Sequence, residues 1–152
     1  MKRAKFLLLI LAAVVVSSSS FLQAQAPRVV EIEGTDMMKF SVTSITARPG
    51  EQLTVRLRVV GKMPKMAMAH NFVLLNAGAD ATAFANAAAM AGATAYIPAA
   101  RKGDVLASTG VAGAGETVEV TFKAPAAAGT YTFLCSFPGH FAAGMRGTLV
   151  VK

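Results

Sequence analysis

The chain has 152 residues, of which 15 are Lys or Arg, eight are Asp or Glu, two are His and one is Cys. Three of the basic residues lie within the first five positions, so positions 27–152 carry 12 basic and 8 acidic residues, a net charge of +4. This mild, dispersed charge without aromatic interleaving argues against nucleic-acid binding, and a single Cys excludes an internal disulfide. The length suits one small domain with its own core.

The first 26 residues have the pattern of a secretory signal. Basic residues precede an apolar run from Phe6 to Val16, which is shorter than the roughly 20 residues that cross a bilayer. We therefore predict a signal peptide at 1–26, with an approximate cleavage site, and export to the periplasm. A single domain at 27–152 follows, and we expect no stable membrane insertion after the signal is removed.

The remainder alternates short apolar runs with Gly, Pro and polar residues, as β-strands joined by turns do. In Gln52–Val59 apolar residues alternate with Thr and Arg, which is typical of one buried and one solvated face. The predicted strands are Val29–Glu33, Phe40–Ala47, Gln52–Val59, Asn71–Leu75, Val105–Ala107, Glu116–Phe122, Thr130–Leu134 and Gly147–Val151. About eight short strands at this spacing predict an all-β sandwich.

One segment departs from the strand pattern. The stretch from Gly78 to Gly92 is rich in Ala, with Asp80 as a candidate N-cap and apolar residues at helical spacing. We predict one short helix there, ended by Gly92 and covering one side of the sandwich. A loop at 93–103 follows, to which we assign no chemistry.

Metal-binding side chains gather near the C-terminus. Cys135, His140 and Met145 have Cys-x4-His-x4-Met spacing, and the only other His is His70, in a strand-like context. Each residue alone is more often part of a core, but the sole Cys with His and Met in one short connection is a far more specific pattern. A thiolate, two imidazoles and a thioether are the ligands of a blue copper site, which suits electron transfer. We predict one type 1 copper per chain.

Two segments carry a family resemblance. Cys135–Leu149, with its Phe-Pro-Gly-His and Gly-Thr-Leu sequences, resembles the azurin group of cupredoxins, and so does His70–Leu74. The resemblance covers about residues 29–152. Azurins have one residue fewer between the ligands at the positions of His140 and Met145, and here the chain is more similar to the auracyanins. The azurin-like and auracyanin-like alternatives stay open.

The resemblance implies a Greek-key β-sandwich and roles for residues around the metal. It implies that Asn71 ties the two ligand regions together, and that the backbone N–H groups of Asn71 and Phe137 approach the Cys135 thiolate. The alternative for Asn71 is an ordinary polar residue at a strand end. A weak backbone contact from Ala69 is also implied, although azurins usually have Gly there. The electron is expected to leave through His140, where transient redox partners would dock on a monomer.

The leading functional hypothesis is a periplasmic electron carrier cycling Cu(I) and Cu(II). The alternative is a copper chaperone or storage protein, suggested by Met residues that could equally form an apolar docking patch. These residues are Met37, Met38, Met63, Met66 and Met68. A copper enzyme would need further His ligands for an open catalytic metal, so we predict no enzymatic activity. From the net charge we expect little ionic steering of partners.

Overall fold

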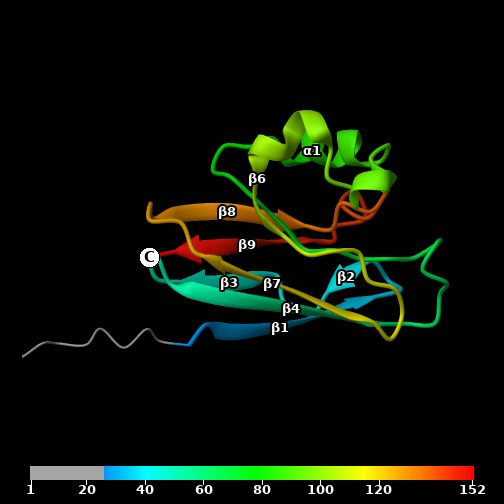
Figure 1. Ribbon diagram of the computed structural model, residues 1–152, viewed down its shortest axis with the longest axis horizontal. Coiled ribbons are helices and arrows are strands. Elements are labelled where there is room, and N and C mark those ends of the chain that lie inside the picture. The colour runs from blue at the N-terminus through cyan, green and yellow to red at the C-terminus, as the bar shows by residue number, and fades with distance from the viewer. Residues whose placement is uncertain (1–25) are drawn as a thin grey trace, which may run out of the picture.

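The computed structural model describes residues 26–152, which form two β-sheets packed face to face (Figure 1). The first sheet has the order β2 (Lys39–Phe40), β1 (Arg28–Thr35), β4 (Gln52–Val60) and β7 (Thr117–Lys123). The second has the order β3 (Ser44–Ala47), β9 (Arg146–Val151), β8 (Gly129–Leu134), β5 (Val73–Leu75) and β6 (Val105–Ser108). The predicted all-β sandwich is confirmed. Except for Ala26, the predicted signal peptide lies outside the described residues.

The predicted strand Phe40–Ala47 is wrong as a single element. Its first part, β2, pairs with β1, whereas its second part, β3, runs parallel to β9 in the other sheet. The crossing is visible in the hydrogen bonds, because Ser41 N donates to the Glu33 carbonyl while Thr148 N donates to the Thr43 carbonyl. The chain therefore changes sheets within three residues, and residues 26–152 form nine strands where eight were predicted.

The predicted helix is present as α1 (Ala81–Ala88), which lies over the second sheet (Figure 1). The Asp80 carboxylate accepts a hydrogen bond from Ala83 N at 2.9 Å and so caps the first turn. Phe84 and Ala88 are fully buried on the face turned toward the sheet. The helix ends before Gly92, which instead begins a short 3₁₀ helix.

The predicted loop after α1 contains two 3₁₀ helices, Gly92–Thr94 and Ala99–Asp104. None of the helices among residues 26–152 is long and apolar enough to span a bilayer.

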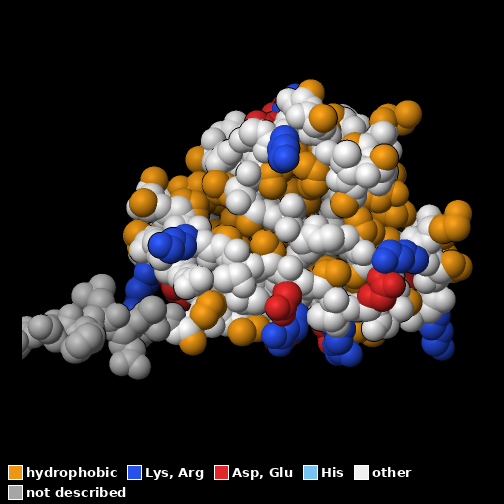
Figure 2. Space-filling model, viewed as in Figure 1, with side chains coloured by type: hydrophobic (Ala, Val, Ile, Leu, Met, Phe, Trp, Pro, Cys, Tyr) orange, Lys and Arg blue, Asp and Glu red, His pale blue; other side chains and the backbone are white. Residues whose placement is uncertain are grey.

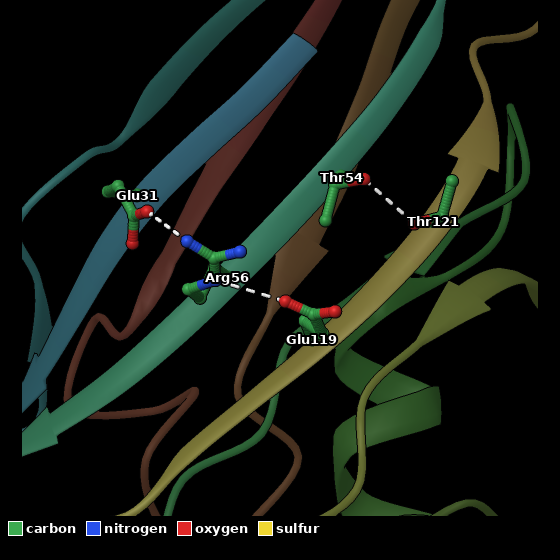
Figure 3. A network of polar contacts seen from close by, with 5 residues as sticks. All are labelled: Glu31, Thr54, Arg56, Glu119 and Thr121. Atoms are coloured by element: carbon green, nitrogen blue, oxygen red, sulfur yellow. Dashed lines mark hydrogen bonds and ion pairs between the residues drawn. The ribbon is translucent and has the colours of Figure 1, made fainter. Parts of the chain in front are cut away.

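The core lies between the sheets, and the outer face of the first sheet is polar. Fully buried side chains alternate along β4 and meet Phe72 and Phe133 from the second sheet. On the outer face Arg56 bridges Glu31 at 2.8 Å and Glu119 at 3.0 Å (Figure 3). Exposed pairs of this kind add little to stability, but they leave the carboxylates paired with neighbouring arginines.

The connection between β8 and β9 is held tightly at both ends. Leu134 pairs with Arg146, and beyond that pair Cys135 N donates to the Met145 carbonyl at 3.0 Å. The next pair, Phe133 and Gly147, has no room for another side chain, because a Cβ on Gly147 would lie 2.5 Å from the Thr43 carbonyl oxygen and 2.7 Å from Phe133 Cε2. The loop at 135–145 thus starts from a rigid base.

We expect Gly147→Ala to lower the free energy of unfolding by about 1–3 kcal/mol, because the added methyl group overpacks this base. Urea unfolding of the metal-free protein measures the change. Gly110→Ala is the control, since no atom lies within 4 Å of the added group, and it should shift stability by no more than about 0.5 kcal/mol. Equal effects of the two substitutions would contradict the tight fit at Gly147.

Candidate metal centre

The two histidines reach the site from different parts of the fold. His70 lies just before β5 and is held by reciprocal 2.8 Å backbone hydrogen bonds with Ala112. Cys135 is the first residue after β8, and His140 lies five residues further along the loop. The side chains of all three are buried, with exposed fractions of 0%, 0% and 2% for His70, Cys135 and His140. Main-chain bonds therefore set the direction of each side chain.

Their ligating atoms form a small triangle. The Nδ1 atoms of His70 and His140 are 3.1 Å apart, and Cys135 Sγ lies 3.4 Å from His140 Nδ1 and 3.9 Å from His70 Nδ1. A metal in the plane of such a triangle, with bonds of about 2.0 Å to nitrogen and 2.3 Å to sulfur, would need separations of about 3.5 and 3.7 Å. The three side chains therefore fit one trigonally bound metal ion.

Met145 lies against the same triangle. The side chain of Met145 is fully buried. It packs with the His70 ring over the α-carbon of Gly34. A Cβ added to Gly34 would lie 3.2 Å from Met145 Cε and 3.1 Å from the His70 ring. The backbone N of Met145 donates to the His140 carbonyl at 2.9 Å. Gly34 of β1 thus leaves the space in which the thioether and the imidazole pack together.

Burial keeps both imidazoles neutral at physiological pH. It lowers the pKa of His140 to about 4, and the neighbouring His70 acts in the same direction. Burial also lowers the pKa of His70, while the Asp36 carboxylate and the Thr35 carbonyl act in the opposite direction. Neutral rings can offer their Nδ1 lone pairs to a metal. The two Nδ1 atoms are 3.1 Å apart, so in the tautomer with both ring protons on Nε2 they can bind one metal ion together.

The Cys135 thiol is protonated in the metal-free protein, but two backbone N–H groups favour its thiolate form. Burial raises the pKa of Cys135 to about 11, and the backbone N–H groups of Asn71 and Phe137 oppose this shift by hydrogen bonding to the sulfur. A bound metal cation would supply the remaining stabilisation of the thiolate. Asn71 and Phe137 are therefore placed at the sulfur, where the family resemblance implies them.

Asn71 also connects the segments that carry His70 and Cys135. Its Oδ1 accepts from Ser136 N at 2.8 Å, and its Nδ2 donates to Ser136 Oγ at 2.8 Å and to the Ala95 carbonyl at 3.0 Å. Ser136 is buried and its role was not predicted from sequence. The one sequence feature that could have indicated this role is the position of Ser136, a hydroxyl residue directly after the only Cys. Ala69 is buried directly before His70, and its backbone contact stays a prediction.

Residues 27–152 match the model of the copper binding proteins of the plastocyanin/azurin family. The chain belongs to this family. Its resident metal is therefore copper, and His70, Cys135, His140 and Met145 are positioned for a single copper site. The predicted relation to azurins and auracyanins is confirmed by the relatives below.

Named relatives of this cupredoxin include auracyanins and azurins. Auracyanin-B of Chloroflexus aurantiacus is 42% identical over 117 residues, or 76% of this chain and 48% of the relative, so the chain spans about half of that protein. The azurin of Bordetella pertussis is 43% identical over 123 residues, which are 79% of this chain and 81% of the azurin. The solved structure of auracyanin A, a "blue" copper protein from Chloroflexus aurantiacus, has a TM-score of 0.72 at 38% identity, covering 84% of this chain and 100% of that one.

Copper binding should release one proton per metal between about pH 7 and 8, because the imidazoles are neutral there and only the thiol must ionise. The apparent affinity should therefore rise about tenfold per pH unit and level off as the pH passes the thiol pKa of about 11. Calorimetric titration in buffers of different ionisation enthalpy counts the protons, and Cys135→Ser should release none from this position. Release of two protons would mean that an imidazole is charged in the metal-free protein.

Proposed function

We propose that this cupredoxin is a periplasmic carrier of single electrons, in which His70, Cys135, His140 and Met145 would hold the copper. The buried triangle of two imidazoles and one thiol carries the proposal. Bound copper supplies the one-electron chemistry, because soft sulfur and imidazole ligands suit both Cu(I) and Cu(II). Residues 1–26 serve as the export signal in this proposal, and 27–152 as the mature monomeric domain.

Rigid attachment of the ligands supports a carrier rather than an enzyme. The bridge of His70 to Ala112 and the bond from Cys135 N to Met145 hold both sides of the site to the sheets. The ligands therefore need little movement when the charge of the metal changes. An enzyme of this kind would need an open metal position with further histidines, and the chain has only two.

The surface around His140 supports electron exit there. His140 is only 2% exposed, and its neighbours Pro138, Gly139 and Ala142 are exposed. A hollow of about 170 Å³ separates this loop from α1 and includes Phe137 and Gly139 in its lining. A redox partner could thus approach the ring closely over small and apolar residues, as transient redox encounters require.

Exposed methionines favour the alternative of copper handling. The side chains of Met37 and Met66 are 78% and 95% exposed, and Met63 is 43% exposed. Thioethers in solvent can take up Cu(I), as a chaperone or storage protein would need. Copper retention on reduction separates the two functions, since a carrier must hold Cu(I) that a chaperone must give up.

Voltammetry of the copper-loaded protein should show a reversible one-electron wave, with copper retained after many cycles in the presence of a Cu(I) chelator. The loaded protein should be intensely blue through charge transfer from the thiolate, and Cys135→Ser should lose that colour because the hydroxyl is not ionised at neutral pH. Met66→Ser is the matched control and should stay blue. Transfer of copper to the chelator on the first reduction would support the chaperone instead.

Met145→Leu should keep the blue colour and raise the reduction potential, because loss of an axial donor costs Cu(II) more than Cu(I). Leu has nearly the same volume, so the fold should tolerate the change. The potential and the paramagnetic resonance spectrum measure the effect, with Met90→Leu as a control at a residue that is 92% exposed. An unchanged potential would remove Met145 from the axial position.

A further inference from the structure

Two cationic side chains contact the loop that carries the copper ligands. Lys39, at the start of β2, donates from Nζ to the Ala143 carbonyl at 2.5 Å, across 104 residues of sequence. Arg146, the first residue of β9, has its Cζ 4.9 Å from the centroid of the Phe141 ring. Both residues are exposed. The loop is thus flanked by one cation from each sheet.

Neither cation has a carboxylate partner among residues 26–152. Six carboxylates form ion pairs with other basic residues, namely Glu31, Glu33, Glu51, Asp104, Glu116 and Glu119. Of the remaining two, Asp80 caps α1 and Asp36 accepts a hydrogen bond from Lys62 N at 2.7 Å. Residues 1–25 contain no acidic residue. Among residues 26–152 no carboxylate therefore forms an ion pair with Lys39 or Arg146.

The surface also shows basic side chains next to acidic ones, as the ion pairs require (Figure 2). Several basic side chains on the face seen in Figure 2 lie directly against acidic ones. The carboxylate that acts on the site is Asp36, which opposes the fall in the His70 pKa, but its Oδ1 is buried and its Oδ2 is engaged by backbone. The two charged side chains that contact the ligand loop, Lys39 and Arg146, are both positive.

We propose that Lys39 and Arg146 form a cationic rim around the copper-ligand loop, and that the redox partner is a protein presenting carboxylates to this rim. The inference rests on the proposed electron-transfer function. Lys39 spends one N–H on Ala143 and keeps two for a partner, and the Arg146 guanidinium can bind a carboxylate through two parallel bonds. A net charge of +4 predicts weak steering on average, but a local pair of charges can orient a partner at the exit.

Small redox ions test the sign of the rim. Oxidation of the Cu(I) protein by hexacyanoferrate(III), an anion, should slow by about tenfold or more from 0.01 to 1 M salt, as the Debye length falls from about 30 to 3 Å. Reduction of the Cu(II) protein by hexaammineruthenium(II), a cation, should quicken over the same range. In the double variant Lys39→Gln, Arg146→Gln both slopes should fall by at least half.

Lys123→Gln is the matched control, because Lys123 is an exposed, unpaired cation that faces Gln52 at the other end of β4. It should change the slopes less than Lys39→Gln does. Equal effects would assign the salt dependence to net charge and overturn the rim. The blue spectrum of every variant reports whether the copper site is intact.

A binding measurement locates the rim without electron transfer. Redox-inert hexacyanocobaltate(III), titrated into the diamagnetic Cu(I) protein, should shift the amide resonances of Lys39, Ala142 and Gly144, and high salt should abolish the shifts. The double variant should lose them. Shifts centred on Lys123 or Lys152 would overturn the proposal. If the copper could not be oxidised and reduced reversibly, the proposed electron-transfer function would be wrong. The titration of the Cu(I) protein would still show whether the anion binds at the rim.

Discussion

Two neutral imidazole nitrogens and a protonated thiol, enclosed together within an apolar sandwich, are the constraint on which this structure depends. The Nδ1 atoms are 3.1 Å apart and His70 and Cys135 are fully shielded from water. Buried polar groups are costly unless they find partners. The two Nδ1 atoms can hydrogen-bond to each other only if one of them carries the proton of its ring. Copper would engage both nitrogens and the sulfur at once, and binding it should therefore stabilise the folded chain.

Backbone hydrogen bonds, joined by the side chain of Asn71, hold the ligand-bearing segments in place. The β8 and β9 ladder continues one pair beyond Leu134 through the bond from Cys135 N to Met145. On the other side, His70 is bonded in both directions to Ala112. Asn71 then closes the gap between these two supports through Ser136 and Ala95. A site built this way keeps its shape when the charge of the metal changes, which is what low reorganisation requires.

The same loop has to be rigid inside and accessible outside. Its inner residues carry the ligands, while Pro138, Gly139 and Ala142 face solvent with little bulk over the His140 ring. Lys39 contributes to both properties, because its bond to the Ala143 carbonyl restrains the loop and its charge remains at the surface. Interior geometry and partner recognition are thus coupled through a few residues of β2 and β9.

The sequence alone determined the kinds of ligand, the spacing of Cys135, His140 and Met145, and most of the strands, because these depend on local patterns and on residues near one another in the chain. The family relation followed from the same short motifs. Only the tertiary structure decided that the chain changes sheets between β2 and β3, since an apolar run does not reveal which sheet pairs with each half. The details of contacts across many residues were also decided there: the spacing of the triangle with His70, Ser136 as the partner of Asn71, and the approach of Lys39 to Ala143. Each joins segments whose separation in space is set by sheet packing, and sheet packing is a property of the whole core rather than of any local pattern.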